Sequence, residues 1–250
     1  MRQQIGINLP FSLTMKVLIG LNLGMWLLGQ VLLEKYTGLP VSKALALHPG
    51  KVILDGTAWQ LVTYMFLHSM QVTHLVLNML MLWFMGAELE QKWGRNFFLI
   101  YYFASGVGSA ILYTAGVWAY YWATGSSMGL AIPVVGASGA IFGLMLAYGI
   151  LFGERTIHFM MIFPMKAKYF VMILAGIEIM SMLSSGTGGG EVAHLAHLGG
   201  LVSGYIALLV LTVWSRRQKT GKTKKKGTQL RLVVDNESDA KSKKDPQYWN

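Results

Sequence analysis

The sequence predicts an all-α membrane protein built as a bundle of six transmembrane helices, and three observations lead to this fold class. Of the 250 residues, 54% are hydrophobic and only 13% are charged, whereas soluble domains average about a quarter charged residues. Six apolar stretches come close to the roughly 20 residues that cross a bilayer as a helix. Lys and Arg gather in the segments between alternate stretches, as in multi-pass membrane proteins. A disordered chain is excluded, and a soluble globular domain is disfavoured.

The predicted spans follow one another along the chain. The first has an apolar run too long for a secretory signal, and no small-residue cleavage site follows it, so we interpret it as a retained helix. The fourth and fifth are short or interrupted by glycine and give the weakest hydropathy signals. The six spans are residues 15–33, 67–86, 97–116, 136–152, 169–184 and 195–214.

Three regions are predicted. Residues 1–14 form a cytoplasmic N-terminal segment, residues 15–214 the six-helix domain, and residues 215–250 a basic, disordered cytoplasmic tail. Within the domain, the first outer loop, 34–66, is long and amphipathic in places. We expect this loop to lie partly in the membrane interface.

The distribution of basic residues predicts the orientation of the chain. With both termini inside, the inner segments outside the tail hold seven Lys and Arg, and the outer segments hold three. Both termini are therefore expected in the cytoplasm. The short chain suggests a bacterial plasma membrane. The tail has eleven Lys and Arg against four acidic residues, which favours attraction to anionic lipid. It lacks interleaved aromatic residues, so a nucleic-acid partner is not expected.

Polar residues within spans are costly and require an explanation. His74 and Asn78 are four residues apart, which places them on one face of the second span. Ser138 begins the fourth span and His197 begins the sixth. These three spans run inward from the same side, so the polar residues share one level of the membrane.

This set of residues can support nucleophilic catalysis. A serine hydroxyl needs a neighbouring base, and the imidazole of His197 can act as that base for Ser138. His74, Asn78 and the backbone N–H of Ser138 can stabilise an oxyanion, because the start of a helix favours negative charge. No acidic residue is expected to orient His197, so the sequence predicts a Ser–His dyad.

Glycines on the fourth and sixth spans predict that these two helices pack closely. Gly136 and Gly139 leave the backbone free around Ser138, and Gly143 lies one turn beyond Gly139. Gly200 and Gly204 form a similar stripe on the sixth span. Small residues let membrane helices approach closely, as a Ser138–His197 hydrogen bond requires.

Each signal also has a structural interpretation. A lone Gly-x-Ser-Gly is usually a packing motif, and a His/Asn pair one turn apart is usually a helix–helix hydrogen bond. His194 and His197 lack the His-Glu-x-x-His pattern of membrane zinc proteases, and the chain has no Cys, so neither a metal nor another cofactor is expected. Glu178, in the fifth span, is interpreted as a buried structural group.

Together and in this order, the motifs resemble the rhomboid family of intramembrane serine proteases over residues 15–214. The matching elements are His68 and His74-x-x-x-Asn78 in the second span, Gly-Ala-Glu-Leu-Glu90 after it, Gly136-x-Ser138-Gly139 in the fourth, and Ala196-His197-x-x-Gly200-x-x-x-Gly204 in the sixth.

The resemblance implies roles for individual residues. Ser138 is the implied nucleophile, His197 the general base, and His74 and Asn78 the side chains of the oxyanion hole. Phe142 matches an aromatic residue that packs on the catalytic histidine. The supporting residues are Gly136, Gly139, Gly200, Gly204 and His68.

The resemblance also implies how substrates reach the site. The expected substrates are membrane proteins cut in or near a transmembrane helix, with residues 184–191 as a mobile lid and the fifth span as a lateral gate. The alternative is a catalytically silent rhomboid-like protein that binds membrane-protein clients. It is disfavoured because Ser138 and His197 are both present. A channel or transporter would require paired charges within the membrane.

Overall fold

The computed structural model describes residues 11–159, 163–184 and 191–223. The chain divides into two units, Met1–Thr212 and Val213–Asn250. The first unit contains all the side chains discussed below, and the described part of the second continues the last helix.

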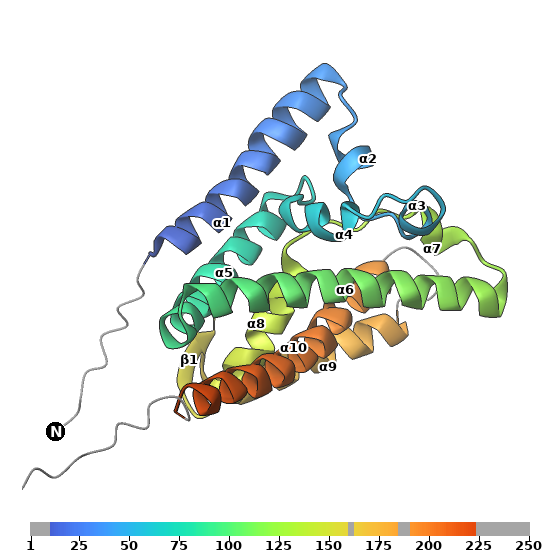
Figure 1. Cartoon of the computed structure of the whole chain (residues 1–250). Coiled ribbons are helices and arrows are strands. Elements are labelled where there is room, and N and C mark those ends of the chain that lie inside the picture. The colour runs from blue at the N-terminus through green and yellow to red at the C-terminus, as the bar shows by residue number, and fades with distance from the viewer. Residues whose placement is uncertain (1–10, 160–162, 185–190, 224–250) are drawn as a thin grey trace, which may run out of the picture. The chain divides into compact units, whose positions relative to one another are not determined.

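The described residues form an all-α bundle with one small β-hairpin (Figure 1). Five helices are long and apolar enough to cross a membrane, and α8 is a shorter apolar helix. Such a set of helices is that of a multi-pass integral membrane protein. The apolar helices are α1 (Leu13–Gly24), continued by the π-helical η1 (Met25–Tyr36), then α5 (Val72–Trp93), α6 (Arg95–Thr124), α8 (Ser138–Leu151), α9 (Ala167–Ser184) and α10 (Glu191–Thr223).

The long loop after η1 folds into short helices, two of which pack against α6. It is anchored by a side-chain network in which Trp59 Nε1 and Gln60 Nε2 both donate to the carbonyl of Ala44. A backbone bridge joins Leu47 to Val134, in the segment that precedes α8. The loop is therefore tied to the start of α8. Its elements are α2 (Val41–Leu45), α3 (Pro49–Leu54), α4 (Gln60–Thr63) and η2 (Tyr64–Phe66), and α7 (Met128–Ala131) lies beyond α6.

Helix α8 lies among other helices rather than facing lipid. It packs against α5, α6 and α9, and eight of its 14 residues are buried. At 1.5 Å per residue it is about 21 Å long, which is shorter than the roughly 30 Å hydrocarbon core of a bilayer. Its sequence can be uniformly apolar and rich in small residues because neighbouring helices surround it.

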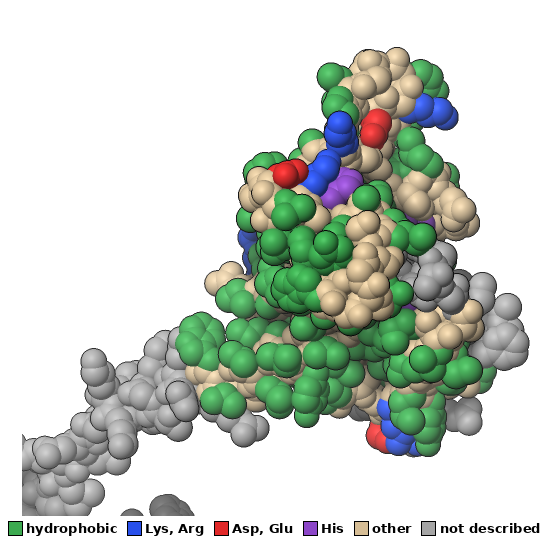
Figure 2. Space-filling view, turned by 90° about the vertical axis from the view of Figure 1, so that its right-hand side faces the viewer, with side chains coloured by type: hydrophobic (Ala, Val, Ile, Leu, Met, Phe, Trp, Pro, Cys, Tyr) green, Lys and Arg blue, Asp and Glu red, His purple; other side chains and the backbone are tan. Residues whose placement is uncertain are grey.

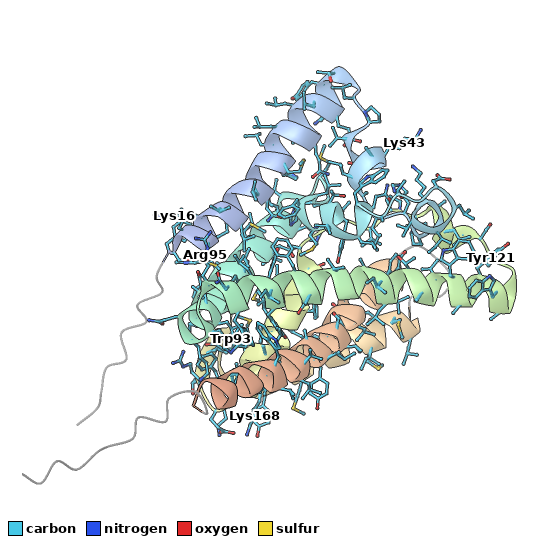
Figure 3. The ribbon with its side chains drawn as sticks, viewed as in Figure 1. Lys16, Lys43, Trp93, Arg95, Tyr121 and Lys168 are labelled. Atoms are coloured by element: carbon cyan, nitrogen blue, oxygen red, sulfur yellow. The ribbon has the colours of Figure 1, made fainter. Side chains whose placement is uncertain are left out.

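Charged side chains gather at two ends of the helices. Figure 2 shows hydrophobic side chains over the middle of one face, with charged side chains above and below. In Figure 3, Lys16, Arg95 and Lys168 lie toward one end, and Lys43 lies toward the other. The three are basic residues predicted to be inside, and Lys43 is predicted to be outside. The two groups are thus separated along the helices, while the side that faces the cytoplasm remains a prediction.

At the end of the helices that holds Lys16, Arg95 and Lys168, acidic side chains contact polar or basic partners. Glu90, at the end of α5, accepts hydrogen bonds of 2.5 Å from both Ser12 and Thr14 at the start of α1. Between α8 and α9, the strands β1 (Thr156–Phe159) and β2 (Phe163–Lys166) pair in antiparallel fashion. This hairpin was not predicted from the sequence. Glu154, just before it, forms ion pairs with Lys166 and Lys168.

Several helix boundaries differ clearly from the prediction, and one of them is the end of α6, which extends to Thr124 although the third span was predicted to end at residue 116. The second span was predicted from residue 67, but α5 begins at Val72. Gln30 explains the difference: its amide donates to the carbonyl of His68 and accepts from the N–H of His68, at 2.7 and 2.8 Å. Both backbone groups are thereby withdrawn from helical hydrogen bonding. At the other end of the chain, α10 extends to Thr223, beyond the predicted end at 214, and the rest of the tail lies outside the described residues.

Candidate active site

Ser138 is the first residue of α8, and the backbone before it is firmly held. Gly136 has a φ of +129°, a conformation that side-chain-bearing residues rarely adopt. The N–H of Gly136 donates to the carbonyl of Tyr64 at 3.0 Å. Together with the Leu47–Val134 bridge, this bond fixes the approach of the chain to Ser138. The segment that leads to Ser138 is therefore anchored at two points, Val134 and Gly136.

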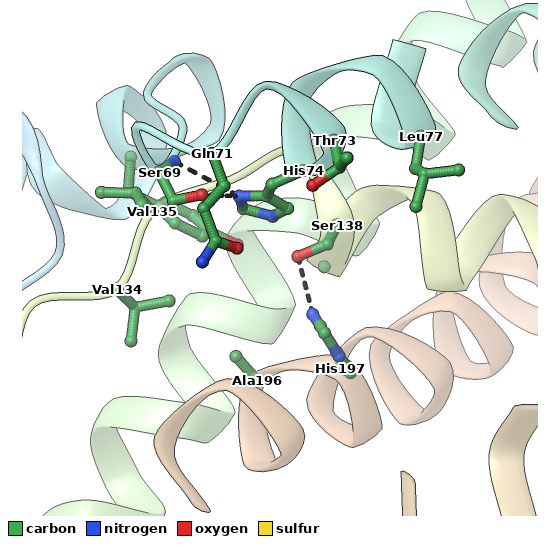
Figure 4. A pocket seen from close by; sticks show the side chains of 12 residues that line it. Ser69, Gln71, Thr73, His74, Leu77, Val134, Val135, Ser138, Ala196 and His197 are labelled. Atoms are coloured by element: carbon green, nitrogen blue, oxygen red, sulfur yellow. Dashed lines mark hydrogen bonds between the residues drawn. The ribbon is translucent and has the colours of Figure 1, made fainter. Parts of the chain in front are cut away.

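His197 lies within hydrogen-bond distance of Ser138. Its Nε2 is 2.9 Å from Oγ of Ser138, as Figure 4 shows. On its other side the imidazole stacks on Phe142, with ring centroids 4.5 Å apart and an interplanar angle of 15°. Phe142 lies one helical turn after Ser138, so a single helix presents the hydroxyl and supports the imidazole that faces it.

The Ser138–His197 contact depends on glycine pairs between α8 and α10. A Cβ at position 204 would lie 2.6 Å from Cα of Gly143, and a Cβ at position 200 would collide with the carbonyl of Gly139. Neither side chain can be accommodated without separating the helices. The two backbones therefore touch directly just below the site.

His74 faces the same space from α5. A Cβ built on Gly136 would lie 3.2 Å from Nε2 of His74 and 3.3 Å from Oγ of Ser138. The imidazole of His74 and the hydroxyl of Ser138 therefore both lie close to the same point in space. The opposite ring nitrogen, Nδ1, accepts the N–H of Ser69 at 3.3 Å and lies 3.1 Å from Oγ of Ser69. Because Nδ1 accepts, the proton of a neutral ring is on Nε2. His74 therefore offers an N–H donor on the side of Ser138.

Asn78 and His68 do not line the cavity around Ser138. Asn78 donates Nδ2 to the carbonyl of His74 at 2.7 Å, which uses one of its two amide N–H groups. His68 is fully buried, and its ring lies 5.3 Å from the ring of His74. Both residues border His74 rather than Ser138.

The cavity beside Ser138 has a volume of about 370 Å³. It lies among α5, the segment before α8, and the first turns of α8 and α10 (Figure 4). Its walls carry both apolar and polar groups, with the Ser138–His197 pair at one side. The lining residues are Tyr64, Ser69, Gln71, Thr73, His74, Leu77, Val134, Val135, Ser138, Gly139, Ala196 and His197.

An acidic residue lies beside His197, which corrects the expectation that none would. Glu178 of α9 places Oε1 3.1 Å from Nδ1 of His197. Its second oxygen, Oε2, lies 2.6 Å from Nδ1 of His194. The side chain of Glu178 is 13% exposed. One carboxylate therefore joins both histidines of α10.

The same three side chains are the group of possible metal ligands among the described residues. The donor atoms of Glu178, His194 and His197 all lie within 4.8 Å of one another. Two histidines and one carboxylate match the ligands of many zinc and iron sites. In their direct contacts, Nδ1 of His194 is hydrogen-bonded to the carboxylate, whereas Nδ1 of His197 lies within ion-pair distance of it without a hydrogen bond.

Comparison with known proteins identifies the family. The family model of the rhomboid domain matches residues 55–214, which is more than half of the chain. The chain belongs to the rhomboid family. It is 32% identical over 199 residues to "RHOMBOID-like protein 2" of Arabidopsis thaliana, covering 76% of this chain and 55% of the relative. The all-α membrane bundle predicted from the sequence is thus the rhomboid fold.

Two bacterial relatives of this rhomboid are named as proteases. It is 29% identical over 160 residues to "Rhomboid protease GluP" of Bacillus subtilis, covering 64% of this chain and 27% of the relative. It is 31% identical over 159 residues to "Rhomboid protease AarA" of Providencia stuartii, covering 60% and 55%. The chain therefore spans about half or less of the length of these relatives.

Sequence reasoning did not identify Ser69 or the role of Glu178 in this rhomboid. Ser69 lies outside a regular helix, so no periodicity connects it with His74. Glu178 could have been found by counting: it lies six residues before the end of α9, and His197 lies six residues after the start of α10. Equal distances from the connecting loop place both at one depth. Most of the predicted lid, residues 185–190, lies outside the described residues.

Proposed function

We propose that this rhomboid is an intramembrane serine endopeptidase that hydrolyses peptide bonds of membrane proteins. The observation that carries the proposal is the 2.9 Å contact between Oγ of Ser138 and Nε2 of His197 at the wall of a 370 Å³ cavity. A hydroxyl bonded to an imidazole is the arrangement of an activated serine nucleophile. No step of the proposed reaction requires a metal or another cofactor.

In the first step, Oγ of Ser138 attacks the carbonyl carbon of the substrate. Nε2 of His197 takes the hydroxyl proton as the new C–O bond forms. The stacked ring of Phe142 holds the imidazole in place during this transfer. The carbonyl π electrons move to the oxygen, which becomes an oxyanion in a tetrahedral intermediate.

The oxyanion needs hydrogen-bond donors that are already in place. The backbone N–H of Ser138, at the start of α8, has no acceptor within the helix, and Nε2 of His74 supplies a second donor. Loss of one such donor lowers the rate by about 10²–10³-fold. Asn78 remains a predicted donor, and its contact with the His74 carbonyl also supports a role in holding the turn that carries His74.

The intermediate then collapses to an acyl-enzyme, which water hydrolyses in a second reaction. Protonated His197 gives its proton to the leaving amine, the C–N bond breaks, and the substrate acyl group remains on Ser138. His197 next removes a proton from water, whose oxygen attacks the ester. The ester C–O bond breaks, and Oγ recovers its proton from His197.

The location of the site favours membrane-protein substrates. The helices that surround it expose large apolar side chains, including Leu77 beside the cavity and Ile177 and Met180 on α9. Because α8 is shorter than the hydrocarbon core, its first residue can lie below the membrane surface while remaining open to water through the cavity. A substrate helix would enter between α5 and α9, with α9 as the gate, and unwind locally at the cavity.

Proteolysis of a model transmembrane substrate in liposomes tests this function. The wild type should cut the substrate, and Ser138→Ala and His197→Ala should not cut above background. Labelling by a fluorophosphonate should require both residues. Cutting by Ser138→Ala at the wild-type rate would overturn the assignment of the nucleophile, and labelling that persists in His197→Ala would remove His197 as the base.

The alternative is a silent rhomboid-like protein that binds membrane clients. The Ser138–His197 contact favours the protease, because a binding protein does not need an activated hydroxyl. The two functions are separated by the liposome assay, since a client-binding protein would retain the substrate intact.

We also propose that both termini face the cytoplasm of a bacterial cell and that residues 1–14, 15–214 and 215–250 are separate functional regions. The unequal distribution of Lys and Arg supports this orientation. The basic tail would then contact anionic lipid. Protease accessibility of the tail in sealed inverted membrane vesicles tests the orientation.

A further inference from the structure

Glu178 connects the Ser138–His197 pair to a second histidine. Its oxygens lie 3.1 Å from Nδ1 of His197 and 2.6 Å from Nδ1 of His194. His197 directs its other nitrogen, Nε2, at Ser138. The three side chains therefore form a line from the carboxylate of α9 through the imidazole of α10 to the hydroxyl of α8.

This contact selects one form of the imidazole. A carboxylate accepts hydrogen bonds and does not donate them, so His194, which is hydrogen-bonded to it, carries a proton on Nδ1. For His197 the carboxylate charge 3.1 Å from Nδ1 repels a lone pair and favours a proton on that nitrogen. A neutral His197 that is protonated at Nδ1 has its lone pair on Nε2. That lone pair faces the hydroxyl of Ser138, as general-base catalysis requires. The opposite tautomer would present an N–H to Ser138 and could not take its proton.

A carboxylate at the position of Glu178, within a membrane-spanning helix, costs free energy unless other groups compensate its charge. Carboxylates within membrane-spanning helices are rare and mark functional sites. Here the side chain is only 13% exposed, and its two oxygens are matched to two imidazole nitrogens. His194 holds one oxygen at 2.6 Å and thereby fixes the side chain so that the other oxygen faces His197.

We propose that Glu178 is a positioning residue that holds His197 in its Nδ1-protonated form, with His194 keeping the carboxylate in place. The proposal rests on the proposed protease function. It extends the predicted dyad to a set of three residues, Ser138, His197 and Glu178, which we call the relay. The proton still passes between Ser138 and His197 only, and the carboxylate stabilises the imidazolium that forms.

Glu178→Gln is the decisive substitution. Glutamate offers an acceptor oxygen to each histidine, whereas glutamine offers one oxygen and one NH₂ group. In either orientation of the amide, the negative charge beside the imidazole of His197 is lost, and where the NH₂ group faces His197 the ring also adopts the wrong tautomer. We expect kcat for a model transmembrane substrate to fall by about tenfold or more, with KM within about twofold of the wild type. Glu154→Gln removes an exposed carboxylate beyond the far end of α8 and should leave both constants unchanged.

Further variants separate positioning from a structural link between α9 and α10. His194→Ala cuts the other half of the link and should lower kcat less than Glu178→Gln does. Glu178→Asp keeps a carboxylate and should recover part of the lost kcat. All assays contain a chelator, because the same side chains could bind a metal ion.

Nitrogen NMR of imidazole-labelled full-length protein gives a readout that does not depend on activity. The chain has six histidines, so the His197 signals are assigned by their loss in His197→Ala. The wild type should show a protonated Nδ1 and an unprotonated Nε2, and Glu178→Gln should shift this balance. The relay is overturned if Glu178→Gln keeps kcat within twofold of the wild type, if the tautomer does not change, or if His194→Ala costs as much.

These results are distinguishable from failure of the protease function itself. If the wild type does not cut, or cuts without Ser138, the proposed function fails. If the wild type cuts by means of Ser138 and His197 but is indifferent to Glu178, only the relay fails.

Discussion

Ser69 holds His74 by two contacts on a single ring nitrogen. The N–H and Oγ of Ser69 lie 3.3 and 3.1 Å from Nδ1 of His74. The serine belongs to the non-helical segment that Gln30 and Trp26 fix to η1, since Trp26 Nε1 donates to the Ser69 carbonyl at 3.1 Å. The ring of the proposed oxyanion donor is therefore oriented from outside its own helix.

Ser69→Ala should lower the activity moderately. The substitution removes the hydroxyl contact, but the backbone N–H of residue 69 remains to donate to Nδ1. We expect a loss of about threefold to tenfold in kcat, against about 10²–10³-fold for His74→Ala, which removes the donor itself. Steady-state cleavage of a model substrate measures both. Equal losses in the two variants would show that His74 depends entirely on Ser69, and no loss in either would remove His74 from the oxyanion hole.

Phe142→Leu should reduce kcat through the imidazole that Phe142 supports. The rings of Phe142 and His197 are 4.5 Å apart and nearly parallel, and stacked aromatic pairs contribute about 0.5–1.5 kcal/mol. If this stabilisation is needed in the transition state, kcat falls by about twofold to tenfold. Fluorophosphonate labelling should slow in parallel. Phe152, which directly follows the last residue of α8, is a control: Phe152→Leu should not change the labelling rate.

The ion pairs of Glu154, at the opposite end of α8 from Ser138, should make the stability of the folded protein depend on pH. Its hydrogen bonds with Lys166 and then Lys168 lower its pKa from 4.5 to about 2. A pKa lowered by folding favours the folded state above pH 4.5, and this contribution disappears as the pH falls from 4.5 toward 2. The side chain is 70% exposed, so the effect is small and screened by salt. The melting temperatures of the wild type and Glu154→Gln should differ slightly at pH 6 and converge below pH 4. A difference in melting temperature that grows on acidification would contradict a lowered pKa of Glu154 in the folded protein.

Much of this site could be predicted because its signals are local. The spacing of His74 and Asn78, the glycine pairs of the fourth and sixth spans, and the position of Ser138 at a helix start each follow from helical geometry. These features fix the depth of a residue and the face it occupies. They indicated that Ser138 and His197 share one level, and the structure brings their side chains to 2.9 Å.

The missing part of the site depends on lateral arrangement, which helical periodicity does not contain. The sequence places Glu178 at the depth of His197 but does not say that α9 lies beside α10 at that point. The start of α5 was misplaced for a related reason: residues 67–71 contain no Gly or Pro that would end a helix, and the distant Gln30 side chain withdraws the His68 backbone from helical hydrogen bonding. Contacts between residues far apart in the sequence therefore decide both features.

Gly200→Ala should damage both stability and activity, because α8 leaves no room for the added methyl group. A Cβ at this position would collide with the Gly139 carbonyl, so α10 must move away from α8 and carry His197 from Ser138. Overpacking of this kind costs about 1–3 kcal/mol. We expect a lower melting temperature and at least a tenfold loss of cleavage. Gly176→Ala is the matched control, since a Cβ there meets nothing within 4 Å and alanine favours the helix. If Gly200→Ala melts and cuts like Gly176→Ala, the close contact of α8 and α10 is not what holds the side chains of Ser138 and His197 together.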